Sequence, residues 1–217
     1  MTATIANPHH AAMRADARRN RERLLGAARQ AFLDDGPHVP LDAIARRAGV
    51  GVATLYRHFP DRSALVRSVV GDVLSGCTAE AHAAFAAGPD AFSALRRFMH
   101  RALDMGVGVM NLIARDVDDA ESSLWRDNCS AAIRQILDQA HRDGTLRADA
   151  SFADIGLALV RFSRPIGAGF DRDLEPAFAH RHLDVYVDGL AARNASSLPG
   201  AALALEDLRA MKDRPDG

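Results

Sequence analysis

The chain has 217 residues, of which 48% are hydrophobic and 25% charged, a composition typical of a globular protein with one or two domains. No apolar run approaches the roughly 18 residues that a membrane span needs, and the N-terminus lacks the apolar segment of a secretory signal. Two cysteines do not make a disulfide framework, so we expect a reducing, cytoplasmic environment and no membrane partner.

The overall net charge of −1 hides an uneven distribution along the chain. Arg14 to Arg67 contains 11 arginines and 6 acidic residues, a net charge of +5, whereas the remainder carries −6. A basic N-terminal third followed by an acidic remainder is typical of a nucleic-acid-binding module joined to a second domain. A chance distribution of solvated charges is the alternative.

The N-terminal residues 1–17 are expected to form a disordered arm, because the first of them are small and polar. A helix is predicted to follow, since Leu25, Ala28 and Phe32 fall at i, i+3 and i+7. The arginines that crowd its leading end are Arg14, Arg18, Arg19, Arg21 and Arg23. They either reach a DNA backbone or form a solvated helix start.

A second helix is predicted after the connector that ends at Pro40, because Leu41, Ile44 and Ala48 repeat at helical spacing. Pro40 fits the first turn of this helix, where its missing N–H costs nothing. Gly49 follows, as a left-handed C-cap requires. A third helix begins soon after the glycine. Two short helices around a tight turn predict a helix-turn-helix, which places its second helix in a DNA major groove.

The third predicted helix, which ends near Phe59, has a core side and an exposed side. At about 100° per residue, Leu55 and Phe59 share the core side, with Val52 near it. Ala53 and Arg57 project almost opposite, where a groove-bound helix meets base edges. Arg57 could therefore contact guanine O6 and N7 with both ends of its guanidinium.

The flanks of the same helix carry Thr54, Tyr56 and His58, whose hydrogen-bonding tips suit phosphate oxygens. The alternative is an ordinary surface helix with a half-buried Tyr56. The helix and glycine turn that precede it favour DNA binding.

The segments RERLLGAARQAF, LDAIARRAGV and GVGVATLYRHFPDRSAL resemble the DNA-binding domain of TetR-family regulators. The resemblance covers roughly Arg18 to Val70, and its specific part is T-L-Y-x-H-F followed by a proline and a basic residue. The arginine-rich start and the wording GVGVATLYRHFP are further similar to the actinobacterial-style, SbtR-like branch.

This resemblance implies which residues meet an operator. The implied contacts come from Gly51, Val52, Ala53, Thr54, Tyr56, Arg57 and His58, with Arg62 on a phosphate and Asp61 as the N-cap of the next helix. The sequence departs from the family at Pro40, which stands where a threonine commonly caps the second helix. It also departs at the first three contact positions, which offer only apolar contacts such as one to a thymine methyl. Arg57 must therefore carry more of the base reading.

The rest of the chain is also predicted to be helical, so the expected fold is all-α. The expected domains are residues 18–66 for the helix-turn-helix and 67–195 for effector binding and dimerisation, followed by a flexible tail, 196–217. Residues that could line a small-molecule cavity are Phe98, Met105, Met110, Trp125 and Cys129, with His100 and Asn111 as conceivable polar contacts. An ordinary buried core explains the same apolar stripe.

The stretch from Met105 to Met110 is apolar and contains two glycines. Either a ligand approaches the backbone closely there, or a helix end turns into a buried connector.

Two long helices are predicted near the C-terminus. Their apolar positions are Phe152, Ile155, Leu159 and Phe162 in the first, and Leu183, Tyr186, Val187 and Leu190 in the second. The family resemblance implies that they pair with a second subunit as a four-helix bundle. Closing the monomer's own core is the alternative.

No motif for catalysis, a metal or a cofactor is recognisable. His180 and His182 are two residues apart and so face different sides of a helix, and no paired metal-ligand spacing exists. We therefore expect a non-enzymatic, homodimeric transcriptional regulator without cofactor. It would be a repressor that leaves a palindromic double-stranded operator when an unknown small-molecule effector binds. Alternatives are an all-α binding protein or enzyme with an architectural helix-turn-helix, an activator, or a repressor without a ligand.

Overall fold

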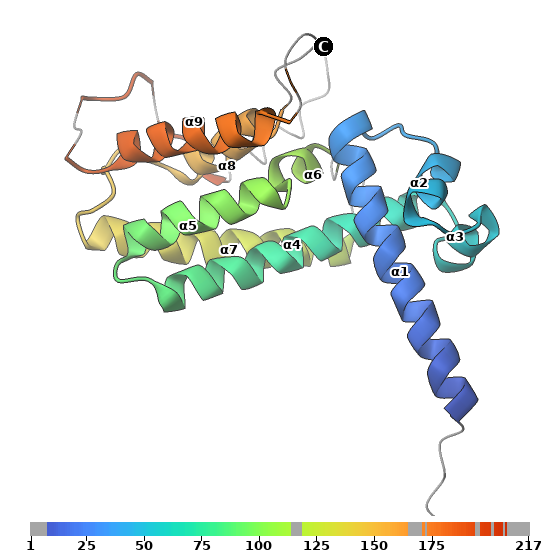
Figure 1. Cartoon of the computed structure of the whole chain (residues 1–217). Helices are drawn as coiled ribbons and strands as arrows, with labels where there is room; N and C mark the ends of the chain where they lie inside the picture. The colour runs from blue at the N-terminus through green and yellow to red at the C-terminus, as the bar shows by residue number, and fades with distance from the viewer. Residues whose placement is uncertain are drawn as a thin grey trace, which may run out of the picture. The chain divides into compact units, whose positions relative to one another are not determined.

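The computed structural model describes residues 8–113, 119–164, 171, 173–193, 196–200, 202–205 and 207. This described part contains nine helices and, apart from one isolated bridge between Leu146 and Ala191, no β-structure (Figure 1). The predicted all-α fold is confirmed. None of these helices is long and apolar enough to cross a lipid bilayer. The chain forms two compact units, Met1–Val70 and Gly71–Gly217.

The N-terminal unit contains three helices and the start of a fourth. They are α1 (Pro8–Asp35), α2 (Leu41–Ala48), α3 (Val52–His58) and the first residues of α4 (Arg62–Ala87). The predicted face of α1 is confirmed, because Ala28 and Phe32 are fully buried and Leu25 nearly so. That face packs against α2, whose Ile44 and Ala45 are also fully buried.

The first helix begins earlier than the sequence predicts. Residues 8–17, expected to belong to a disordered arm, are helical, and the rest of that arm lies outside the described residues. The segment contains four alanines, and alanine is the strongest helix former. Pro8 stands at the first helical position, where a proline costs no hydrogen bond.

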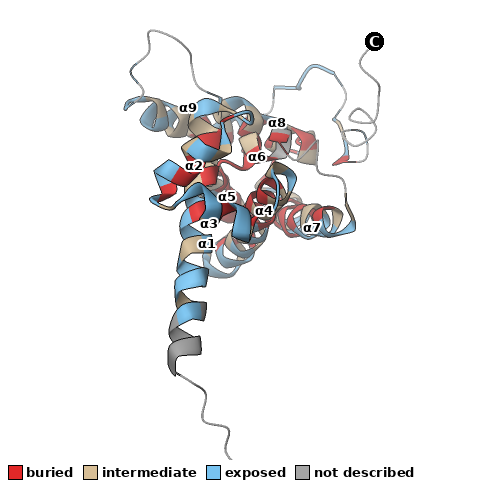
Figure 2. Ribbon diagram, turned by 90° about the vertical axis from the view of Figure 1, so that its right-hand side faces the viewer, coloured by how far each residue is buried: buried red, intermediate tan, exposed pale blue. Residues whose placement is uncertain are grey.

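The C-terminal unit contains the rest of α4 and five further helices. They are α5 (Ala91–Asp104), α6 (Val107–Ile113), α7 (Ala120–Arg142), α8 (Phe152–Phe162) and α9 (Glu175–Leu190). α5 lies at the centre, in contact with α6, α7, α8 and α9. The buried residues face inward on α4, α5 and α7 (Figure 2), and Leu95, Phe98 and Ile136 are fully buried.

Three helices of this unit start where a side chain caps them. Asp90 accepts a hydrogen bond from the backbone N–H of Ser93, and Asp119 accepts one from Ser122, each at 2.8 Å. Ser151 and Asp154 form a reciprocal capping box at the start of α8. These caps satisfy N–H groups that have no partner inside the helix, and they fix the ends of α5, α7 and α8.

Candidate nucleic-acid interface

The turn between α2 and α3 has the geometry that its glycine predicts. Gly49 adopts a left-handed conformation, φ +66°, and the N–H of Val50 donates to the carbonyl of Ala45 at 3.0 Å. A Cβ atom at Gly49 would lie 2.9 Å from Nη2 of Arg23. Glycine is favoured here by the left-handed backbone conformation, since the end of the Arg23 side chain can move away from a Cβ. Pro40 is the N-cap of α2, with an extended backbone, and lies just before the first turn.

The recognition helix α3 presents one buried and one exposed side. Leu55 is fully buried and Phe59, its C-cap, is 2% exposed. Arg57 is exposed, and Tyr56 keeps 50% of its surface accessible. The placement of Val52 near the core side is wrong, because its side chain is 39% exposed. Val52 opens a short helix one turn before Leu55 and so lies beyond the packed layer.

Arg57 is held along the exposed side of α3. Its Nη2 donates a hydrogen bond to Oγ1 of Thr54 at 2.8 Å. This contact leaves the other N–H groups of the guanidinium available. The two side chains therefore form a polar pair on the surface that a groove-bound helix would turn toward bases.

Arg62 has partners inside its own unit. Its Nη1 donates to the carbonyl of Pro37 at 2.7 Å, and its Nη2 donates to the carbonyl of Val39. Both carbonyls belong to the connector ahead of α2. Arg62 thus fixes this connector, whereas the family resemblance implied a phosphate contact. The neighbouring Asp61 accepts from the N–H of Ala64 at 2.7 Å, so its predicted capping role is confirmed.

Arg21, expected either at a DNA backbone or at a solvated helix start, has structural contacts within the N-terminal unit that the sequence did not predict. Its guanidinium carbon lies 5.3 Å from the ring centre of Phe59, and its Nη2 donates to Oγ of Ser68 at 3.2 Å. It therefore connects α1 with the end of α3 and with α4. No local sequence pattern predicts such contacts, because Ser68 is 47 residues away from Arg21 in the sequence.

Other arginines of the α1 start pair within the helix. Arg18 contacts Glu22 at 3.6 Å, and Arg19 pairs with Asp16. Such exposed pairs contribute little to stability and open easily. They are compatible with both of the expected roles, a solvated helix start and a DNA-backbone contact.

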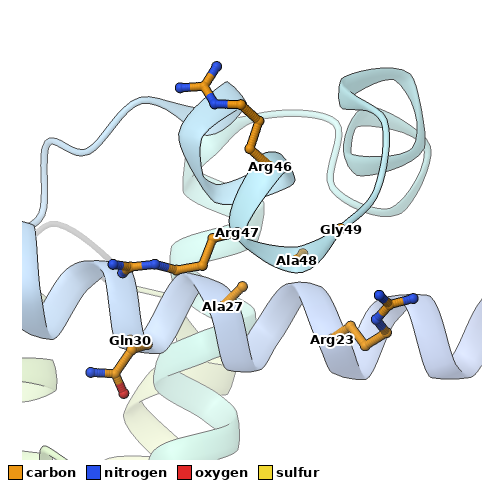
Figure 3. A pocket seen from close by; sticks show the side chains of 7 residues that line it. All are labelled: Arg23, Ala27, Gln30, Arg46, Arg47, Ala48 and Gly49. Atoms are coloured by element: carbon orange, nitrogen blue, oxygen red, sulfur yellow. The ribbon is translucent and has the colours of Figure 1, made fainter.

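An open hollow lies between α1 and α2 (Figure 3). Its lining residues are Arg23, Ala27, Gln30, Arg46, Arg47, Ala48 and Gly49. Acidic neighbours balance part of its charge, because Arg46 contacts Asp42 at 2.6 Å and Arg47 contacts Asp34 at 3.0 Å. The pairing of Arg47 fastens the end of α2 to the end of α1.

The five residues expected at an effector cavity fall into two groups in the C-terminal unit. Phe98, Met110 and Cys129 are at most 4% exposed and belong to the core. Trp125 and Met105 are only partly buried. Both lie against glycines of α4: a Cβ at Gly71 would be 2.6 Å from the Trp125 ring, and one at Gly76 would be 2.7 Å from Cε of Met105.

The glycine-containing stretch contains the end of α5 and a buried turn, as the second interpretation predicts, although the short helix α6 follows in place of a connector. Gly106 turns the chain with φ +69°, and α6 begins at Val107. A Cβ at Gly108 would lie 2.4 Å from the carbonyl oxygen of Leu159. This glycine therefore lets α6 and α8 approach closely.

The two polar contacts considered for the cavity have different outcomes. Nε2 of His100 lies 3.0 Å from Oδ1 of Asp184, and its Nδ1 lies 2.7 Å from Nδ1 of His180. These contacts join α5 to α9, so His100 is engaged in helix packing. The side chain of Asn111 lies outside the described residues.

Most residues expected at a dimer interface instead pack inside the C-terminal unit. The buried ones are Ile155, Leu159, Leu183, Val187 and Leu190, each at most 4% exposed. Phe162 and Tyr186 are partly exposed and form an edge-to-face pair with centroids 5.8 Å apart, and Phe152 is also partly exposed. Helical periodicity identifies such residues as buried without telling which surface covers them.

Different apolar side chains of α8 and α9 face outward. They are Leu157, 43% exposed, Phe178, 37% exposed, and Val185, 68% exposed. We call these three residues the outer α8–α9 face.

Comparisons with known proteins agree with this geometry. The family model of bacterial regulatory proteins of the tetR family matches residues 24–69, the helix-turn-helix itself. An HTH-type transcriptional regulator of Staphylococcus aureus (strain USA300) is 41% identical over 59 residues, 27% of this chain. The matched part spans about a third of that relative, 32% of its length.

Solved structures extend the likeness over most of the chain. A TetR transcription regulatory protein from Mycobacterium vanbaalenii is 34% identical, with a TM-score of 0.57, over 82% of this chain and 99% of that one. The TetR-like regulator LfrR from Mycobacterium smegmatis, in complex with proflavine, shares the fold with a TM-score of 0.61 and 24% identity, over 83% of this chain and 98% of its own. An architectural helix-turn-helix in an all-α enzyme is not favoured by these relatives. The chain belongs to the TetR family of transcriptional regulators, a family that is not enzymatic.

Proposed function

We propose that this chain is a sequence-specific repressor that binds operator DNA as a homodimer in the cytoplasm and is released by a small-molecule effector. The observation that carries the DNA-binding part is the two-sided α3. Leu55 and Phe59 anchor it in the core, while Tyr56 and Arg57 are exposed. A short helix fixed on one side and polar on the other suits a DNA major groove.

Arg57 is the proposed base reader, because a guanidinium can donate to guanine O6 and N7 together. Thr54, Tyr56 and His58 are proposed to contact phosphates, which set the register of the helix without reading sequence. At the start of the helix, Val52 and Ala53 are exposed and offer contacts to a thymine methyl. Gly51 there allows close approach of the backbone. Arg62 acts mainly by holding the connector ahead of α2.

The outer α8–α9 face is the proposed dimer interface. Leu157, Phe178 and Val185 expose apolar surface on two helices that contact each other. The same two helices also carry Phe152, Phe162 and Tyr186, which are partly exposed. A two-fold pairing of two helices from each subunit produces a four-helix bundle. It also presents two recognition helices related by the same symmetry, which suits a palindromic operator.

The proposed effector region lies around Trp125 and Met105, which fit against Gly71 and Gly76 of α4. Close by in sequence, Ser122 is fully buried on α7, and its Oγ has no hydrogen-bond partner within the described residues. A buried hydroxyl without a partner is unfavourable, so a ligand that supplies one gains affinity there. LfrR, which shares the fold, was solved with a small molecule.

Release from DNA requires that the effector bind more tightly to the state with low operator affinity. The coupling is then reciprocal, and operator DNA weakens effector binding by the same factor. The chain contains a single tryptophan, Trp125, so its fluorescence reports on effector candidates without labelling. A ligand that quenches this fluorescence but leaves operator affinity unchanged would contradict its role as an effector.

The DNA-binding proposal is tested by fluorescence anisotropy with DNA from upstream of the chain's own gene. We expect saturable binding that survives excess unrelated DNA and weakens as salt rises, because phosphate contacts release counterions. If genomic fragments selected at moderate salt show no sequence preference, the proposed function is wrong.

A further inference from the structure

The two cysteines of the chain lie against each other in the C-terminal unit. Cys77 on α4 is fully buried, and Cys129 on α7 is 4% exposed. Their sulfur atoms are 3.0 Å apart, and both are free thiols. These are the two cysteines of the 217-residue sequence, so the pair includes both of its thiols.

The helices that carry these thiols are fixed next to each other. Trp125, one turn before Cys129 on α7, lies against Gly71 of α4 at a distance that leaves no room for a side chain. A disulfide bond requires sulfur atoms about 2.05 Å apart, so the two would have to approach by only about 1 Å.

We propose that Cys77 and Cys129 form a reversible oxidation site, at which a small hydroperoxide converts the two thiols into a disulfide that links α4 to α7. The Cys129 thiol ionises, and its thiolate attacks one oxygen of the hydroperoxide to form an S–O bond. The O–O bond breaks, and the departing oxygen takes up the proton that Cys129 released, so that it leaves as an alcohol, or as water from hydrogen peroxide. The sulfenic acid on Cys129 is then attacked by the sulfur of Cys77. The S–S bond forms, the S–O bond breaks, and the hydroxyl leaves with the Cys77 proton as water.

The surroundings decide which cysteine reacts first. The hydrogen bond between the two thiols lowers the pKa of Cys129. The same hydrogen bond, together with burial, raises the pKa of Cys77. Since the thiolate is the nucleophile, Cys129 is the attacking residue and Cys77 the resolving one.

Burial also determines which thiol reacts with the sulfenic acid. Cys77 is already in contact with Cys129, whereas a bulky thiol such as glutathione cannot enter a site this buried. An internal disulfide is therefore the expected product. In a reducing environment it would be transient, as redox-sensing disulfides are.

The test treats the folded, full-length chain with hydrogen peroxide, followed by thiol counting after unfolding and by peptide mapping. We expect both thiols to disappear, the mass to fall by two hydrogen atoms, and one peptide pair to contain Cys77 linked to Cys129. Dithiothreitol should restore both thiols. Thermal unfolding of the oxidised chain should occur at a higher temperature, because the link restricts the unfolded state.

Two single variants separate the roles of the cysteines. Cys77→Ser should accumulate a sulfenic acid on Cys129 that dimedone traps when the oxidised chain is unfolded in its presence, whereas Cys129→Ser should react much more slowly. Equal reactivity of the two variants would overturn the assigned order. In the wild-type chain, which needs no variant to fold, persistent free thiols, oxygen added without a link, or disulfides between chains would overturn the site itself.

Discussion

Gly49 determines the turn that presents α3. Its φ of +66° is a conformation that residues with a Cβ adopt at a cost of about 1–2 kcal/mol, whereas the flexible end of the Arg23 side chain nearby can move away from a Cβ. Gly26, in the exposed middle of α1, can accept a Cβ, since its backbone is helical and nothing lies within 4 Å of a Cβ placed there.

Substitution of these two glycines by alanine should therefore change stability in opposite directions. Gly49→Ala is expected to lower the free energy of unfolding by about 1–2 kcal/mol or more. Gly26→Ala should raise it by about 0.5–1 kcal/mol, because alanine favours the helix interior. Urea unfolding followed by circular dichroism measures both changes. Equal effects of the two substitutions would show that Gly49 is not conformationally required.

The residues of the interface differ in how far the sequence predicts them. Gly49 and Asp61 act on backbone atoms within a few residues, so their types and positions predict their roles. Arg62 instead binds carbonyls 23 and 25 residues away, and Arg21 a hydroxyl 47 residues away. Contacts over such separations depend on how the helices pack, which local patterns do not specify.

At the scale of the elements, helical spacing predicts α4, α5 and α7 well, because one face of each is buried within the chain. The same spacing does not distinguish burial inside the monomer from burial against a second copy. Leu183 and Val187 illustrate this limit, since both were candidates for the dimer interface and both are fully buried in their own unit. Val185, between them in sequence, is 68% exposed.

A charge on the outer α8–α9 face should weaken the dimer. Val185→Glu is expected to shift the protein to monomers at micromolar concentration, because a carboxylate would be buried without a partner. Leu124→Glu on α7, at a position 57% exposed, is the matched control and should remain dimeric. Analytical ultracentrifugation gives both association constants. Dimers of unchanged affinity in Val185→Glu would place the interface elsewhere.

At the scale of the whole molecule, the charged pair of Arg147 and Asp149 joins segments of the C-terminal unit that are far apart in the sequence. Arg147, 7% exposed, donates to Asp149 at 3.0 Å, to the carbonyl of Gly189 at 3.2 Å and to that of Ser196. Asp149 also accepts from the N–H of Leu198 at 3.1 Å. The loop after α7 is thus fastened to the end of α9 and to the segment beyond it.

This network predicts how stability responds to acid. The hydrogen bonds from Arg147, and then that from Leu198, lower the pKa of Asp149 to about 2. An aspartate of the unfolded chain has a pKa of about 3.9. The stabilisation is therefore present above about pH 4 and is lost as the pH falls toward 2.

Asp149→Asn should lower stability at neutral pH and flatten its dependence on pH between about 4 and 2. Asp138→Asn, which removes an exposed carboxylate from α7, is the matched control for the loss of one charge. Urea unfolding at a series of pH values compares the two. If the free energy of unfolding of Asp149→Asn fell with pH as steeply as that of the wild type, other carboxylates would determine acid stability.

The proposed function requires that α3 distinguish one DNA sequence from another through Arg57. The deciding measurement is the ratio of affinities for the operator and for unrelated DNA, obtained by anisotropy at fixed salt. Arg57→Ala should reduce this ratio by at least about fivefold, since a bidentate contact to guanine contributes about 1–3 kcal/mol to discrimination. Arg142→Ala removes the same charge from α7 and should leave the ratio unchanged within about twofold. An Arg57→Ala protein that distinguishes the two DNAs as well as the wild type would contradict base reading by this helix.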